Sequence, residues 1–125
     1  EAMLVTLPGP ASQRDAAHTA ELLLQERQIP ARLVVNRTVP KLFACMRSTV
    51  DDVMDGVGLP LLGVVPDDEN IVISTNQGEP LVGKDCQAGQ AYMNICHRIL
   101  GEEVPYLNLE ATNGLFQKLK AIFKK

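Results

Sequence analysis

The chain has 125 residues, of which 46% are hydrophobic and 22% charged, with a formal net charge of −3. These proportions are ordinary for one globular domain that is long enough to bury a core. The negative net charge argues against nucleic acid as a partner of the whole molecule. No stretch approaches the roughly 20 apolar residues of a membrane span. The cysteines lack CxxC spacing, which fits a reducing, cytoplasmic compartment better than a disulfide framework or a zinc site.

Apolar runs and helical patterns follow one another along residues 1–104. The runs read as buried strands and cover residues 2–7, 31–37 and 59–66. Helices are predicted over residues 12–28, 48–58 and 84–101. The first two begin at apparent capping boxes, Ser12 with Asp15 and Ser48 with Asp51. The pattern of residues 69–78 suits either a strand or a helix, and a short helix is favoured. Residues 38–47 are expected to form a loop.

Strands that alternate with helices predict right-handed βαβ crossovers, and therefore an α/β fold with a parallel sheet flanked by helices. A sheet of three strands leaves at least one long apolar edge uncovered, which complete proteins normally avoid. The sequence also opens inside a strand-like run, EAMLVTLP. We therefore expect an incomplete sheet and an excerpt of a longer protein.

Candidate ligand-binding residues follow the predicted strands, because ligands of open parallel sheets bind beyond the carboxyl ends of the strands. The Asn36 amide can donate and accept a hydrogen bond at once, as an adenine edge requires, although asparagine also suits a strand-end turn. After the third strand, Asp67 and Asp68 can bond ribose hydroxyls but equally resemble a solvated turn. The loop after the first strand, residues 8–10, is neither GxxxxGKS/T nor GxGxxG, so no phosphate site is expected there.

No residue pattern predicts a catalytic site or a metal site. Cys96 and His97 look like a nucleophile pair, but neighbours on a helix point about 100° apart and cannot meet. We expect Cys96 to be buried in a stripe with Tyr92, Ile95 and Ile99.

A basic amphipathic helix is predicted over residues 113–125, after a linker over 105–112. With about 100° per residue, its large apolar side chains fall within an arc of about 120°: Leu115, Phe116, Leu119, Ile122 and Phe123. Its lysines cover the rest: Lys118, Lys120, Lys124 and Lys125. Three partners suit this pattern: the protein's own core, the groove of a partner protein and an anionic membrane surface.

Four sequence blocks in the same order resemble the C-terminal half of the MinD family of septum-site-determining ATPases, which are P-loop ATPases of the deviant Walker A class. The blocks are LVTLPGPASQRDAAHTAELL, LVVNR, LPLLGVVPDDENIVISTNQGEPLV and AGQAYMNICHRILGEEVP, and the basic tail follows them. The resemblance covers nearly the whole chain, and TVPKLFACMRSTVDD is its least family-like part. It implies that residues 1–104 are the C-terminal portion of a P-loop ATPase domain.

The resemblance implies an ATPase that forms a homodimer around ATP and Mg²⁺ and binds the inner face of the cell membrane through its C-terminal helix. Such a protein recruits a division inhibitor, is released by an activator of hydrolysis, and controls placement of the division septum. Asn36, with Arg37 beside it, is similar to the asparagine that recognises adenine. Pro66, Asp67 and Asp68 resemble the loop that borders the base and ribose. The apolar arc of the tail resembles the membrane-inserting face, with the lysines beside it.

The family's phosphate-binding lysine loop, signature lysine and switch regions belong to its N-terminal half and have no counterpart in this sequence. Without them a protein has no grip on the β- and γ-phosphates and no metal site. We therefore expect the full-length parent to hydrolyse ATP, and this chain alone to bind no cofactor and to be inactive. The alternative is a non-enzymatic half-domain whose tail binds the groove of a partner protein.

Overall fold

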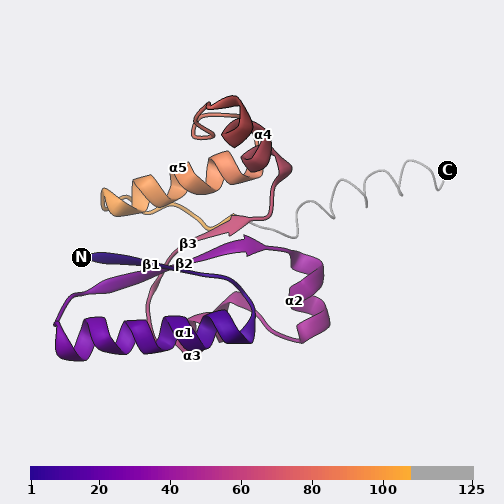
Figure 1. Cartoon of the computed structure of the whole chain (residues 1–125). Helices are drawn as coiled ribbons and strands as arrows, with labels where there is room; N and C mark the ends of the chain where they lie inside the picture. Colours follow the sequence, from indigo (N-terminus) through magenta and orange to yellow (C-terminus); the bar gives the residue numbers. More distant parts are fainter. Residues whose placement is uncertain (108–125) are drawn as a thin grey trace.

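The computed structural model describes residues 1–107. The predicted helix over residues 113–125, with its proposed membrane-binding side chains, and most of the linker lie outside the described residues. A parallel sheet lies between two layers of helices (Figure 1). None of the described helices is long and apolar enough to cross a membrane. The predicted α/β fold with an incomplete parallel sheet is confirmed.

The elements alternate along the chain as the sequence predicted. The strands are β1 (Ala2–Thr6), β2 (Ala31–Thr38) and β3 (Leu61–Pro66). The helices are α1 (Pro10–Glu21) with its π-helical continuation η1 (Leu22–Glu26), α2 (Pro40–Met46), α3 (Val50–Val57), α4 (Glu69–Gln77) and α5 (Gln87–Ile99). The strand order is β1-β2-β3, so β2 is central and is buried on both faces, as a parallel strand between helical layers must be.

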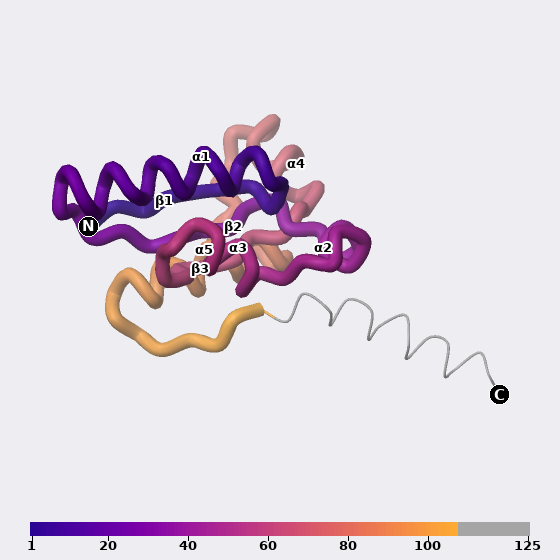
Figure 2. Tube along the Cα trace, turned by 90° about the horizontal axis from the view of Figure 1, so that it is seen from below, coloured from indigo at the N-terminus to yellow at the C-terminus, as the bar shows by residue number. Residues whose placement is uncertain are grey.

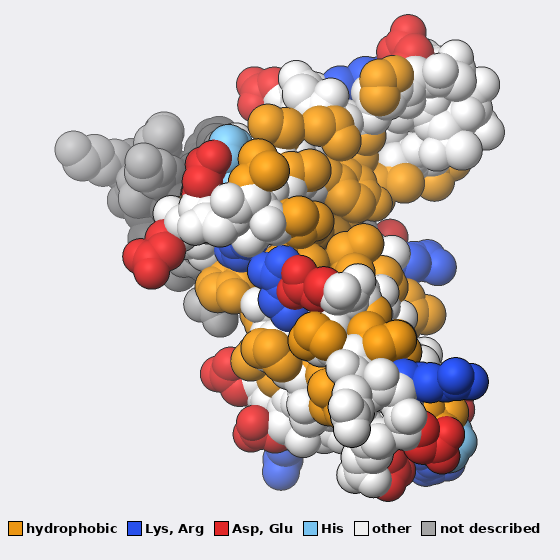
Figure 3. Space-filling view, turned by 90° about the vertical axis from the view of Figure 1, so that its left-hand side faces the viewer, with side chains coloured by type: hydrophobic (Ala, Val, Ile, Leu, Met, Phe, Trp, Pro, Cys, Tyr) orange, Lys and Arg blue, Asp and Glu red, His pale blue; other side chains and the backbone are white. Residues whose placement is uncertain are grey.

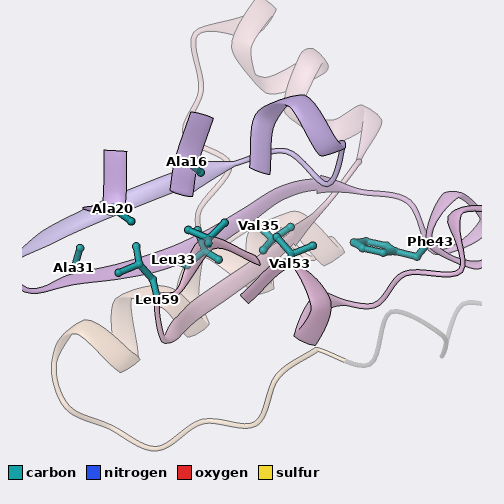
Figure 4. Packing of buried hydrophobic residues seen from close by; sticks show 9 residues of the cluster. Ala16, Ala20, Ala31, Leu33, Val35, Phe43, Val53 and Leu59 are labelled. Carbon is teal, nitrogen blue, oxygen red and sulfur yellow. The ribbon is translucent and has the colours of Figure 1, made fainter. Parts of the chain in front are cut away.

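Two hydrophobic clusters hold the layers together, one on each face of the sheet. Helices α1 and α3 pack on one face over the first cluster (Figure 4): Ala16, Ala20, Ala31, Leu33, Val35, Phe43, Val53, Val57 and Leu59. Helix α5 packs on the other face over the second cluster: Val34, Leu62, Val65, Leu81, Ala88, Ala91 and Ile95. Successive side chains of β2 point to opposite faces, so Leu33 and Val35 belong to the first cluster and Val34 to the second.

Gly63 in β3 allows α5 to approach the sheet closely. A Cβ atom at this position would lie 2.3 Å from Cγ1 of Ile95, far inside van der Waals contact. The α5 residues that face the sheet are accordingly small, Ala88 and Ala91, together with Ile95. Cys96 points about 100° away from Ile95 around the helix, and Ile99 is the last residue of α5. The predicted buried stripe is therefore wrong for Cys96 and Ile99, which are exposed.

Three local predictions differ from the structure. Helix α1 begins two residues before Ser12, because Pro10 occupies its first turn and its fixed φ suits that position. The capping box of α3 is Thr49 with Asp52, one residue beyond the predicted pair. The expected loop over residues 38–47 contains α2, which begins at a proline and anchors itself through the buried ring of Phe43.

Strand β1 has an uncovered face as well as an uncovered edge. Met3 and Val5 are 55% and 52% exposed, because α5 packs over β3 and over Val34 of β2. Figure 3 shows hydrophobic side chains gathered on the side of the molecule where the strands begin. This confirms the expectation that a three-stranded sheet leaves an apolar edge open.

The segment after α5 turns back and runs beside β3 toward its carboxyl end (Figure 2). Arg98 holds it by donating to the carbonyl oxygens of Leu62, Val104 and Pro105 at 2.9–3.3 Å. The Tyr106 hydroxyl donates to the first carbonyl of β3 at 3.0 Å, and the Arg98 guanidinium lies 4.0 Å from the centre of its ring. These bonds hold residues 104–106 beside the beginning of β3, at Leu61 and Leu62.

Candidate functional site

The carboxyl ends of β2 and β3 lie side by side and bring the predicted site residues together. Thr38 is the register partner of Pro66, and its hydroxyl donates to the carbonyl oxygen of Val65 at 3.1 Å. The backbone N–H of Asp67 then donates to the carbonyl oxygen of Thr38 at 3.0 Å. These bonds place the segment Asn36–Arg37 directly beside the segment Pro66–Asp68.

Arg37 bends the end of β2. Its φ of 54° lies in the left-handed region, which costs a non-glycine residue about 1 kcal/mol or more. The register of β2 against β3 is irregular between Val35 and Thr38, as expected where a strand carries an extra, strained residue. Asn36 supports the bend, because its Oδ1 accepts the backbone N–H of Arg37 at 2.9 Å.

The Asn36 amide is half-buried and only partly used. Its oxygen has the local bond described above and a second lone pair, whereas its NH₂ group donates to no protein atom among residues 1–107. A side-chain amide in this state offers one donor and one acceptor to a planar ligand. The edge of adenine offers the complementary pair, one acceptor and one donor.

Arg37 and Asp67 form an ion pair across the two strand ends, with Nε and Oδ1 3.5 Å apart. Both side chains are largely exposed, so solvent screening limits the pair to about 1 kcal/mol or less. The pair therefore orients the two side chains at the rim of the site more than it stabilises the fold.

Asp68 joins the amino ends of two helices. It is the N-cap of α4, where its Oδ1 accepts the backbone N–H of Asn70 at 2.9 Å and the Asn70 side-chain amide at 2.7 Å. Its Oδ2 accepts the backbone N–H of Ala88, in the first turn of α5, at 3.1 Å. Partial burial raises the pKa of Asp68, but the hydrogen bonds from Asn70, Ala88 and Cys86 outweigh it and leave that pKa below the ordinary value. Both oxygens are thus engaged by protein groups.

An open hollow of about 570 Å³ lies between the amino ends of α4 and α5. Its lining is polar and acidic: Asp67, Asp68, Glu69, Asn70, Asp85, Cys86 and Gln87. No lysine or arginine of residues 1–107 lines it, so this acidic lining disfavours phosphate and favours neutral hydroxyl groups, as a ribose has. Within residues 1–107, no three His, Cys, Asp or Glu side chains gather as a metal site.

Sequence reasoning missed the double role of Asp68. The Asp-x-Asn pattern at the start of a predicted helix is an N-cap signal, and it was available for α4. The hydrogen bond from Ala88 to Asp68 joins residues 20 positions apart, and no local sequence pattern predicts it. The assignment of Asn36, Arg37, Pro66, Asp67 and Asp68 to a nucleotide stays a prediction.

No protein-family model matches the chain. The septum site-determining protein MinD of Helicobacter pylori is 35% identical over 98% of this chain, and that of Bacillus subtilis is 39% identical over 98% of it. These alignments cover 48% and 47% of the relatives, so the chain spans about half the length of the curated relatives it matches.

A solved MinC:MinD cell division protein complex from Aquifex aeolicus contains a chain that superimposes with a TM-score of 0.77 and 28% identity, over 84% of this chain and 44% of that one. MinD of Pyrococcus horikoshii, solved with Mg-ADP, superimposes with a TM-score of 0.66 and 23% identity, over 78% of this chain and 40% of that one, and supports the fold alone.

Proposed function

This chain is a homologue of the MinD septum-site-determining proteins, and we propose that it is the C-terminal half of such a protein. In this proposal the whole protein is an ATPase that cycles on and off the inner face of the cell membrane and controls placement of the division septum. The observation that carries the proposal is the alignment over 98% of the chain. The alignment includes the two strand ends whose side chains meet at the candidate site.

The chain contributes the base and ribose end of a nucleotide site. The Asn36 amide is matched to the edge of adenine, the buried ring of Pro66 provides an apolar wall at the end of β3, and Asp67 with Arg37 forms the rim. Asp68 keeps the loop in place. The hollow beyond them suits ribose hydroxyls, whereas the triphosphate and Mg²⁺ need the lysine loop of the N-terminal half. The chain alone therefore does not hydrolyse ATP.

The partners in this proposal are those of the Min system. A MinD chain was solved in complex with MinC, which supports a division inhibitor as one partner. An activator of hydrolysis is the second. A second copy of the whole protein is the third, with ATP held between the two copies.

The tail is proposed as the membrane anchor, and its energetics favour a reversible one. Burying five large apolar side chains contributes roughly 7–15 kcal/mol when complete and about half of that on shallow insertion. Each lysine near anionic lipid adds about 1 kcal/mol. Ordering a dozen residues costs about 1 kcal/mol or more apiece. One tail is therefore marginal, whereas two tails on an ATP-bound dimer gain by avidity.

Vesicle co-sedimentation tests the anchor. The intact chain and a chain ending at residue 113 are mixed with anionic and with neutral vesicles, each also fused to a dimerisation domain. We expect the dimerised intact chain to bind anionic vesicles only, and truncation to remove the binding. If the dimerised intact chain stays in solution with anionic vesicles, the membrane part of the proposal is wrong.

A further inference from the structure

Helix α2 presents a surface that is both apolar and basic. Its inward residue, Phe43, is buried in the first cluster. On its outer face Leu42 and Met46 are 55% and 42% exposed. Lys41 and Arg47, beside them, are exposed as well. We call Lys41, Leu42, Met46 and Arg47 the α2 surface.

The charge of the α2 surface is uncompensated. Residues 37–50 contain Arg37, Lys41 and Arg47 and no acidic residue, although the chain as a whole is acidic. Arg37 is paired with Asp67, whereas Lys41 and Arg47 form no ion pair with any residue in the described part of the chain. Two unpaired cations next to exposed aliphatic side chains make a combination that an anionic, partly apolar partner complements.

Other exposed apolar side chains of residues 1–107 have different surroundings. Residues 1–7, which carry Met3 and Val5, and residues 69–77, which carry Val72 and Ile73, contain no lysine or arginine. Exposed Ile99 follows Arg98 in α5, but Arg98 donates to carbonyl oxygens of the segment after α5. The α2 surface places two exposed aliphatic side chains beside two cations within residues 41–47.

The position of α2 agrees with a lipid partner. It lies at the end of the molecule where the strands end (Figure 1). Residues 101–107 run beside β3 toward that same end before they enter the basic segment 108–125 (Figure 2). The described part of the chain therefore ends on the side of the molecule that carries α2, and four lysines follow it in the sequence.

We propose that the α2 surface is a second contact with an anionic lipid bilayer. Leu42 and Met46 enter the boundary between headgroups and acyl chains, and Lys41 and Arg47 lie among anionic headgroups. This inference rests on the proposed membrane association but goes beyond it, because that association needs only the tail. A contact through the tail alone does not specify the orientation of the domain at the membrane, whereas a second contact at α2 restricts it.

Fluorescence tests the contact, because α2 carries an exposed cysteine. Cys45 lies on α2, whereas Cys96, exposed as well, lies on α5. The full chain is prepared with one of these labelled by an environment-sensitive dye and the other two cysteines replaced by serine. We expect anionic phosphatidylglycerol vesicles to shift the emission of the Cys45 label to the blue and to leave the Cys96 label unchanged.

Substitutions in the unlabelled full chain give a second readout in co-sedimentation. Leu42→Glu is expected to weaken binding to anionic vesicles about tenfold. The double variant Lys41→Gln, Arg47→Gln is expected to weaken it about fivefold for each charge removed. Leu24→Glu is the matched control, because Leu24 is 42% exposed but lies in η1, which follows the C-terminal end of α1 and is not part of the α2 surface. The control should bind within about twofold of the unchanged chain.

The outcomes separate this inference from the tail anchor. If the chain sediments with vesicles while the Cys45 label stays unshifted, or if Leu42→Glu binds as the control does, the α2 contact is wrong and the tail anchor stands. If the full chain fused to the dimerisation domain does not bind anionic vesicles at all, both are wrong.

Discussion

Removing the carboxylate of Asp68 should loosen two helices at once. Asp68→Ala deletes an acceptor at the amino end of α4 and another at that of α5, and the loss of each such bond typically costs about 1 kcal/mol. The expected loss is therefore about 2 kcal/mol, a large part of the roughly 5–15 kcal/mol that holds a domain folded. Asp68→Asn keeps one acceptor oxygen, so about 1 kcal/mol is expected.

The effect of Asp68 should depend on pH, because hydrogen bonds hold its folded-state pKa below the ordinary value. A lowered pKa means that the stabilisation is fully present above the unfolded pKa of about 3.9. It is lost as pH falls through the folded pKa. The gap in unfolding free energy between the unchanged chain and Asp68→Asn should therefore narrow in acid.

Urea unfolding followed by circular dichroism measures both effects, at pH 7 and in steps toward acid. Asp67→Asn is the matched control, because the Asp67 side chain is exposed and, among residues 1–107, contacts a polar partner only in its ion pair with Arg37, so its replacement should cost less than about 0.5 kcal/mol. Equal stability of Asp68→Asn and Asp67→Asn, or a gap that stays constant into acid, would refute the reasoning.

Three further predictions concern packing, the C-terminal segment and the tail. Gly63→Ala should lower the unfolding free energy by about 1–3 kcal/mol, since its Cβ meets Ile95. In urea unfolding, Gly63→Ala should cost less in a chain that already carries Ile95→Ala than in the unchanged chain. An additive double variant contradicts this. Tyr106→Phe removes a hydrogen bond to β3, so it should lower the unfolding free energy by about 1 kcal/mol and speed amide hydrogen exchange in β3. Unchanged exchange contradicts this. Phe116→Glu should abolish binding to anionic vesicles, and undiminished co-sedimentation contradicts this.

The strands and α5 could be predicted from the sequence because buried runs and helical periodicity are local signals. Helix α2 could not, because seven residues with one buried side chain, Phe43, leave no periodic pattern. The α3 cap was ambiguous because Ser48 and Thr49 each precede an aspartate by three residues. Cys96 was misplaced because the apolar residues of α5 cover more than one face of the helix, and only the packed sheet decides that Ala88, Ala91 and Ile95 are the ones buried.

The sequence predicted that the candidate site lies at the carboxyl ends of the strands, but not its detailed geometry. That the segments after β2 and β3 would lie side by side follows from parallel neighbouring strands. The left-handed conformation of Arg37 did not follow, because a non-glycine residue adopts it only when tertiary contacts enforce it. The long-range acceptor role of Asp68 was also hidden, because it depends on where α5 begins relative to α4.

Supplying the missing half tests the central claim most directly. The chain is joined downstream of the N-terminal half of Bacillus subtilis MinD, and the ATPase activity of the folded chimera is measured with Asn36→Ala and, as a matched control, Asn76→Ala on exposed α4. The account predicts an active chimera in which Asn36→Ala raises KM for ATP at least tenfold, with a smaller change in kcat, and Asn76→Ala changes neither. A folded chimera that binds no ATP, or one indifferent to Asn36→Ala, would contradict it.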